Sequence, residues 1–227
     1  MKKLIYLIAI SFIFSCNKAA QKDHLKHSEN ILDYHITPAS KFDKKGLMFS
    51  DQGAWFAYSF PDSVHKITGF SGPFLMTQQN GIWSSASLTN LVIESNQWKS
   101  IKTTSFNSHL EQTFSSDNLE LKQELVFFSG HTAIIQSTIK NTSTAKKTLN
   151  YHFNNEQVLA DGLKFSTTSN NQLTIKSSKT DAIGHIIFPK NVLLKSTDSS
   201  YISNNISLVL NPNETTTFAV SQSFIFK

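Results

Sequence analysis

The stretch "NLELKQELVFF", residues 118–128, alternates apolar and polar side chains with a period of two. One face carries Leu119, Leu121, Gln123, Leu125 and Phe127, and the other carries Glu120, Lys122, Glu124 and Val126. Successive side chains of a β-strand point to opposite sides, so this pattern is typical of a strand with one buried and one wet face. We therefore predict a strand here, with a single polar interruption of its buried face at Gln123.

The same alternation recurs in the segments 149–153, 173–175 and 218–226, and turn-forming sequences separate these runs. Helical periodicity is nearly absent, because serine, threonine and asparagine fill the positions that a helix gives to alanine, glutamate and leucine. Short strands with one wet face predict an all-β, antiparallel β-sandwich of the supersandwich kind. At 227 residues and 39% hydrophobic, the chain is long enough to bury the core of such a domain.

The N-terminus has the pattern of a bacterial lipoprotein signal. Two lysines precede the apolar run 4–14, which ends in the string "IFSC" at Cys16, the single cysteine of the chain. This string resembles a lipobox, whose cysteine is lipidated and becomes the first mature residue, although an ordinary signal peptide with an incidental cysteine is the alternative. We predict a signal peptide over residues 1–15, a lipid anchor on Cys16, and a periplasmic or cell-surface location on a membrane.

The positive charge of the chain comes from lysine alone. All 21 basic residues are lysines, and the formal net charge is +5. Recognition of phosphate and guanine favours the arginine fork, and the lysines form no cluster with interleaved aromatic residues. We therefore expect no nucleic-acid partner.

The folded part is expected to begin after a polar tether and lead-in at residues 16–45, and to occupy residues 46–227. Five of the eight glycines lie between Gly46 and Gly81, among many aromatic residues. We predict a strand at 52–60 and otherwise a long loop region rich in glycine, proline and aromatic residues. Its large apolar side chains, as in "ITGFSGPFLM" at 67–76, are expected to pack against another surface.

The usual catalytic patterns are missing from the sequence. The single cysteine lies in the signal, no Gly-x-Ser-x-Gly string occurs, and the acidic residues are scattered. His109 and Glu111 would share one face of a strand, where they could supply two metal ligands or belong to a polar outer face. We expect no catalytic residue, no metal site and no cofactor.

The tryptophans offer a different chemistry, since sugar rings stack on exposed aromatic side chains. The three candidates are Trp55, Trp83 and Trp98. Tryptophan in a sandwich also fills the core, and that alternative stays open for each of them.

The loop region carries a resemblance. The string "SDQGAWFAYSFPDSVHKITGFSGPFLMTQQNGIW", residues 50–83, resembles the N-terminal domain of bacterial enzymes of glycoside hydrolase family 63, alpha-glucosidases related to the mannosyl-oligosaccharide glucosidases. The matching positions are Asp51, Gly53, Ala54, Trp55, Pro61, Gly69, Phe70, Gly72 and Pro73. A weaker similarity extends over residues 46–226.

The resemblance implies a β-sandwich that precedes an (α/α)6 barrel, and it places the inverting acid and base of the family in that barrel. No position of this chain corresponds to them, so the chain alone is not expected to be active. The resemblance suggests a non-catalytic N-terminal domain of a truncated or split alpha-glucosidase whose barrel is encoded downstream. The alternative is a free-standing surface lipoprotein that binds an oligosaccharide.

Four residues of the matching strings are candidates for contact with a glycan or with the catalytic domain. They are Asp51, Trp55, Phe70 and Pro73. The competing interpretation is that they form a buried loop core within the sandwich itself.

Overall fold

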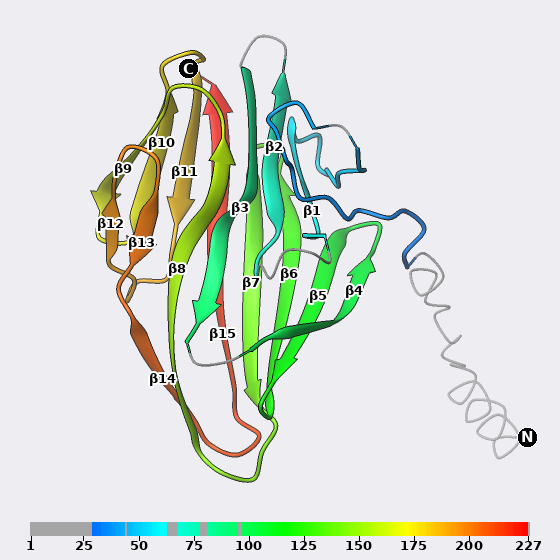
Figure 1. Ribbon diagram of the computed structural model, residues 1–227, viewed down its shortest axis with the longest axis vertical. Helices are drawn as coiled ribbons and strands as arrows, with labels where there is room; N and C mark the ends of the chain where they lie inside the picture. The colour runs from blue at the N-terminus through cyan, green and yellow to red at the C-terminus, as the bar shows by residue number, and fades with distance from the viewer. Residues whose placement is uncertain (1–28, 44, 63–67, 78–80, 95–96, 227) are drawn as a thin grey trace, which may run out of the picture.

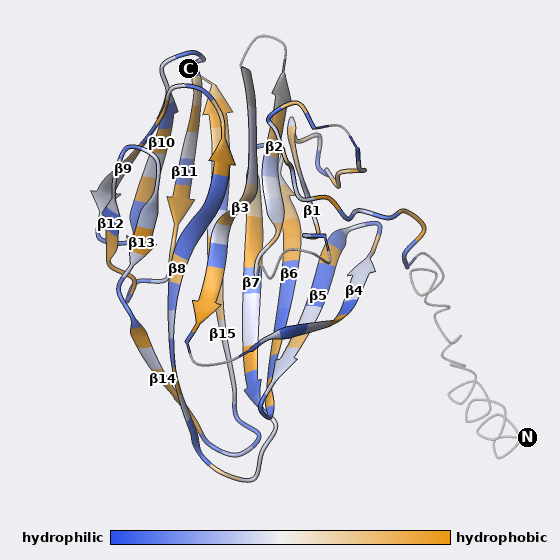
Figure 2. Ribbon diagram, in the orientation of Figure 1, coloured by the Kyte–Doolittle hydropathy of each residue, from blue (hydrophilic) through white to orange (hydrophobic). Residues whose placement is uncertain are grey.

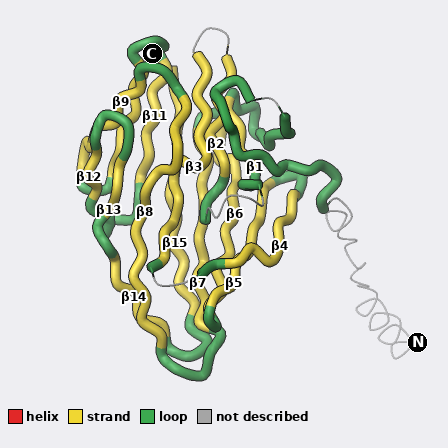
Figure 3. The backbone as a smooth tube through the Cα atoms, in the orientation of Figure 1, coloured by secondary structure: helices red, strands yellow, loops and turns green. Residues whose placement is uncertain are grey.

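A computed structural model describes residues 29–43, 45–62, 68–77, 81–94 and 97–226. The described chain forms two antiparallel β-sheets that pack face to face (Figure 1), and all its regular elements are strands (Figure 3). The predicted all-β sandwich is therefore confirmed. The predicted signal peptide at residues 1–15 and Cys16 lie outside the described residues. Among the residues that the structure describes, no helix is long and apolar enough to cross a membrane.

The larger sheet has eight strands in the order β4-β5-β6-β7-β15-β11-β10-β9. Their bounds are β4 Lys99–Ser105, β5 His109–Ser116, β6 Leu119–Ser129, β7 Thr132–Asn141, β9 Leu163–Ser169, β10 Gln172–Ser177, β11 Ala182–Ile187 and β15 Thr215–Phe226. Strand β6 is the strand predicted from the opening stretch.

The smaller sheet has seven strands in the order β1-β2-β3-β8-β13-β12, and β14 also pairs with β8. Their bounds are β1 Phe56–Ser59, β2 Ser71–Thr77, β3 Gly81–Ile93, β8 Lys147–Leu159, β12 Leu194–Ser196, β13 Tyr201–Ser203 and β14 Ile206–Leu210. Apolar and polar residues alternate along many of the strands of both sheets (Figure 2), so each sheet turns its apolar side chains toward the other.

The predicted polar interruption at Gln123 is part of a hydrogen-bonded row inside the sandwich. Gln112, Gln123 and Ser137 lie directly opposite one another on β5, β6 and β7, and each is at most 3% exposed. The Gln112 Nε2 donates to Gln123 Oε1 over 3.0 Å, and the Gln123 Nε2 donates to Ser137 Oγ over 3.1 Å. These pairs offset the cost of burying three polar side chains.

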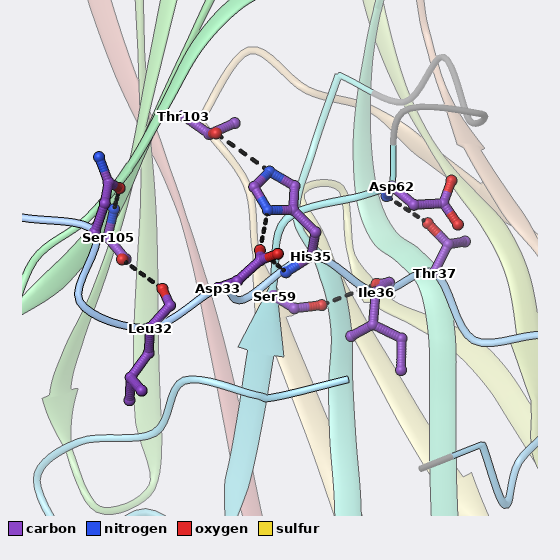
Figure 4. Close-up of polar contacts among 10 residues, drawn as sticks. Leu32, Asp33, His35, Ile36, Thr37, Ser59, Asp62, Thr103 and Ser105 are labelled. Carbon is purple, nitrogen blue, oxygen red and sulfur yellow. Dashed lines mark hydrogen bonds and ion pairs between the residues drawn. The ribbon is translucent and has the colours of Figure 1, made fainter. Parts of the chain in front are cut away.

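The lead-in contacts the edges of both sheets on one side of the sandwich, and Figure 4 shows several of its polar contacts. Asn30 exchanges hydrogen bonds with Ser105 on the edge strand β4, and the Ile36 amide donates to Phe60 O beyond β1 over 3.0 Å. On the opposite side, the Leu194 amide of β12 donates to Asn170 O beyond β9 over 2.8 Å. Backbone hydrogen bonds thus bridge the two sheets on both sides of the sandwich.

The prediction of a loop through the glycine and proline string was wrong for Ser71–Thr77, which form β2. Pro73 is tolerated because it falls at a bulge in the β1–β2 pairing and before the first β2–β3 pair at Leu75, where no ladder bond is required from its nitrogen. The strand predicted at 52–60 is shorter than expected. Gln52 and Gly53 have positive φ angles of 54° and 68°, so the chain turns there before β1 begins.

Candidate functional site

The segment Thr68–Phe70 packs between the two sheets. Gln112 Nε2 donates to Gly69 O over 2.7 Å, and Gln123 Nε2 reaches Thr68 O over 3.4 Å. Phe70 is 1% exposed. The surface against which this apolar segment packs is therefore the interior of this sandwich.

A second set of buried contacts joins the sheets beside this segment. The Tyr58 hydroxyl donates to Gln222 Oε1 over 2.8 Å, and Gln222 Nε2 donates to Thr89 Oγ1 over 2.8 Å. Burial raises the pKa of Tyr58 well above its ordinary value, so its hydroxyl stays protonated and remains a donor. The packing of the two sheets is thus fixed here by directional bonds as well as by apolar contact.

The four interface candidates fall into two environments. Phe70 and Pro73 are buried, so their side chains contribute to packing in this structure. Asp51 and Trp55 are half-buried. The centroid of the Trp55 ring lies 4.0 Å from the centroid of the Phe226 ring at the end of β15. Asp51 O accepts the Ala54 amide over 2.9 Å, which holds the turn that presents Trp55. A contact role for the four residues stays a prediction.

The tryptophans are held by the sandwich. Trp83 is 4% exposed and belongs to the core, while Trp55 and Trp98 are half-buried and pack against it. All three indole Nε1 atoms are buried and have no hydrogen-bond partner in the described part of the chain. The core alternative is therefore confirmed for Trp83.

His109 and Glu111 do share the outer face of β5, and Glu124 on β6 joins them. Their possible ligand atoms lie within 4.8 Å of one another. The Lys122 ammonium lies 2.9 Å from Glu111 Oε2 and 3.0 Å from Glu124 Oε1. Burial lowers the pKa of Lys122, but the bonds and charges of the two carboxylates outweigh this and raise it. A protein cation thus already pairs with both of the carboxylates that a metal would use.

The lead-in contains an arrangement that the sequence analysis missed. Asp33 Oδ1 lies 2.5 Å from His35 Nδ1, and His35 Nε2 lies 3.2 Å from Thr103 Oγ1 on β4 (Figure 4). The His35 ring packs on Phe60 with a centroid distance of 5.0 Å. The Asp-x-His spacing was visible in the sequence, but the strand that supplies Thr103 was not predictable from it. Because the Asp33 side chain is 82% exposed, we interpret the contacts as a latch for the lead-in.

This latch should weaken in acid. The hydrogen bond with His35 lowers the pKa of Asp33, so its stabilising effect is present above the unfolded pKa of about 3.9 and is lost as pH falls through the folded value. In Asp33→Asn, we expect the hydrogen-exchange protection factor of the Ile36 amide to fall about two- to fivefold near neutral pH, as for an exposed pair. Asp198→Asn, on the opposite side, is the control. Equal protection in all three proteins would refute the latch.

A polar groove of about 700 Å³ lies at the end of the larger sheet where β5 turns into β6. Its lining residues are Gln97, Lys99, Ser115, Ser116, Asp117, Asn118, Leu119, Glu120 and Thr142. Asp117 and Asn118 form a two-residue hairpin turn with φ angles of 43° and 63°, a conformation that these residue types tolerate. The Thr142 amide donates to Asn118 O over 2.8 Å, which fixes the turn against the end of β7.

The polar side chains that line this groove are unpaired within the described part of the protein. None of them makes a hydrogen bond or ion pair with another described residue, although Ser116 is only 8% exposed. The groove was not predicted, because its residues come from three separate segments and carry no spacing signal. Its volume lies in the usual range of small-molecule sites.

The fold and these contacts define an all-β sandwich domain with a polar groove at one end. The family described as "Glucosidase YgjK, N-terminal" matches residues 28–183. The chain belongs to this family, and the matched range includes both the Asp51–Trp55 turn and the Gly69–Pro73 segment. Among curated protein sequences, none matches the chain.

Three solved structures match the chain at low sequence identity. The Slr1438 protein from Synechocystis sp. PCC 6803 is 10% identical, with a TM-score of 0.50, and the match covers 85% of this chain and 98% of that one. A putative aldose 1-epimerase from Escherichia coli K12 is 9% identical, with coverages of 58% and 69% and a TM-score of 0.39. Heparan sulfate lyase HepC from Pedobacter heparinus is 11% identical, with a TM-score of 0.40, and the match covers 81% of this chain but 37% of the lyase.

Proposed function

We propose that this chain is the non-catalytic N-terminal domain of an alpha-glucosidase of the glycoside hydrolase family 63 type, acting in carbohydrate metabolism with an (α/α)6 catalytic barrel that lies outside this chain. The observation that carries the proposal is the family match over residues 28–183. The sandwich fold and the two strings that the family resemblance rests on, at 51–55 and 69–73, support it.

The carboxylates of the larger sheet favour a non-catalytic role. A glycosidase needs one carboxyl group that presents a proton and a second that attacks or activates water. Glu111 and Glu124 lie opposite each other, but both accept hydrogen bonds from Lys122. Neither residue lines the polar groove. Their arrangement supports an ionic cluster on the sheet surface.

The turn at Asp51 supports the assignment of a contact surface for the barrel. It holds the Trp55 ring on Phe226, so the Trp55 side chain lies where β15 ends. In this proposal the two half-buried residues meet the catalytic domain, and the buried Phe70 and Pro73 support the fold from inside.

The DNA immediately downstream of the coding sequence tests the proposal. We expect an in-frame or frameshifted region of helical coding sequence that resembles the family barrel. A clean intergenic gap with no such region nearby would contradict a split or truncated glucosidase and would favour an autonomous module.

We further propose that the chain is exported and anchored to a membrane through lipidated Cys16, with residues 17–45 as a tether and lead-in. In Cys16→Ser, metabolic labelling with an alkyne fatty acid should be lost and the protein should leave the membrane fraction. Retained labelling in Cys16→Ser would contradict the anchor, and a serine substitution at an exposed site such as Thr148→Ser should change neither readout.

A further inference from the structure

We propose that the polar groove at the β5–β6 turn is a binding site for a short, neutral oligosaccharide. This site is separate from the Asp51–Trp55 end of the molecule and from the Glu111–Glu124 cluster. The existence of a site for a hydrophilic ligand rests on the groove itself, and the choice of a carbohydrate rests on the proposed function.

The unpaired polar side chains of the lining are the first argument. None of them makes a hydrogen bond or ion pair with another described residue, whereas the side chains of Gln112, Gln123 and Gln222 inside the sandwich are bonded. Ser116 is only 8% exposed as a residue, yet its unpaired hydroxyl stays accessible. These groups are free to form hydrogen bonds with a ligand in the groove.

The composition of the lining is the second argument. Residues with hydroxyl, amide, carboxylate and ammonium groups line one space of about 700 Å³, together with Leu119. Hydroxyl and amide groups donate and accept at once, which matches the hydroxyl groups of a sugar. The lining contains no aromatic side chain, so recognition would depend on hydrogen bonds in place of ring stacking.

Charge decides which carbohydrate fits. Lys99 contributes one positive charge, and Asp117 and Glu120 contribute two negative charges, so the formal charge of the lining is 1 − 2 = −1. Sulfated and uronic-acid-rich glycans are repelled by such a surface, and phosphate would lack an arginine fork. A neutral sugar carries no such penalty and can accept from Lys99 while donating to the two carboxylates.

The rigidity of the groove favours binding. The hairpin turn at Asp117 and Asn118 is only two residues long, and the Thr142 amide bonds to it. Ser115 and Ser116 belong to a strand that is paired on both sides, with β4 and β6. Groups that are already held in place lose little conformational entropy when a ligand binds.

Titration of the isotope-labelled protein with maltotriose and with mannotriose, followed by amide NMR shifts, tests this inference. We expect at least one of the two to shift the amides of residues 115–120 with a Kd of about 1 mM, and a sulfated heparin disaccharide not to shift them. Thr142 is exposed, so Thr142→Trp should fill the groove without disturbing the core and should weaken binding more than tenfold. Thr148→Trp, also exposed but outside the groove, should bind like the original protein.

Ser116→Ala gives a second variant that keeps the groove open, and it should weaken binding about three- to tenfold through the lost hydroxyl. The inference is overturned if neither trisaccharide shifts these amides at about 10 mM, a range that covers weak sites. It is also overturned if the heparin disaccharide binds better, or if Thr142→Trp binds as well as Thr148→Trp. These results leave the downstream sequence test unchanged, so failure of the groove is distinguishable from failure of the proposed function.

Discussion

Gly69→Ala is expected to lower the free energy of unfolding by about 3 kcal/mol, because the position has no room for a methyl group. A Cβ atom there would lie 2.5 Å from Ser87 Oγ, 3.0 Å from Thr89 O and 3.4 Å from Asn90 Cα. Two of these three atoms are backbone atoms. The clash is therefore relieved only if β3 moves away from the segment Thr68–Phe70, which packs between the two sheets. Urea denaturation followed by tryptophan fluorescence measures the change.

A double-mutant cycle shows whether this loss comes from the predicted contact. The Ser87 hydroxyl is fully buried and has no partner among the described residues, so Ser87→Ala alone should change stability by less than about 0.5 kcal/mol. Combined with Gly69→Ala, it should recover part of the loss, because it removes the nearest atom. Strictly additive effects of the two substitutions would contradict close packing of Gly69 against β3.

Gln123→Leu is expected to destabilise the protein by about 2–3 kcal/mol, although leucine is the more apolar residue. The substitution removes the acceptor of Gln112 and a donor to Ser137 and to Thr68 O, while the neighbouring polar groups stay buried. Leaving a buried polar group without a partner destabilises the folded state by more than the net contribution of one hydrogen bond. Chemical denaturation measures the change in the free energy of unfolding. Hydrogen exchange at residues 68–70 should become faster, because the segment Thr68–Phe70 is held less firmly.

The matched control is Gln136→Leu on the outer face of β7. Gln136 is exposed and makes one long bond of 3.4 Å to Glu124 Oε2. This substitution should change the free energy of unfolding by less than about 0.5 kcal/mol. Equal stability of Gln123→Leu and Gln136→Leu would contradict this account. The buried row of Gln112, Gln123 and Ser137 would then not hold the segment Thr68–Phe70.

The strand alternation predicted the sandwich well because burial on one face imposes a period of two. The 119–127 alternation became β6, and the odd residue in it, Gln123, proved to be a bonded core residue. The glycine and proline string was predicted less well. Local signals indicated a loop at 71–77, but pairing with β1 and β3 overrode them once Pro73 could lie at a bulge.

The candidate site was only partly accessible from the sequence. The resemblance singled out Asp51, Trp55, Phe70 and Pro73, yet a sequence string does not reveal that two of them face the interior. The pair His109 and Glu111 was visible as a spacing, whereas Lys122 between the carboxylates depends on the register of β5 and β6. The polar groove combines the ends of four strands and a turn, and such long-range proximity leaves no mark on local composition.

The central claim, that this chain is the non-catalytic domain of a glucosidase, is tested most directly by assaying the purified, folded protein for hydrolysis of 4-nitrophenyl α-glucoside. The account predicts no release of nitrophenol above the protein-free blank. Glu111→Gln and Glu124→Gln variants distinguish the chain from a contaminating enzyme, since they alter the two neighbouring carboxylates that share Lys122. Turnover by the original protein that either variant abolishes would contradict the claim.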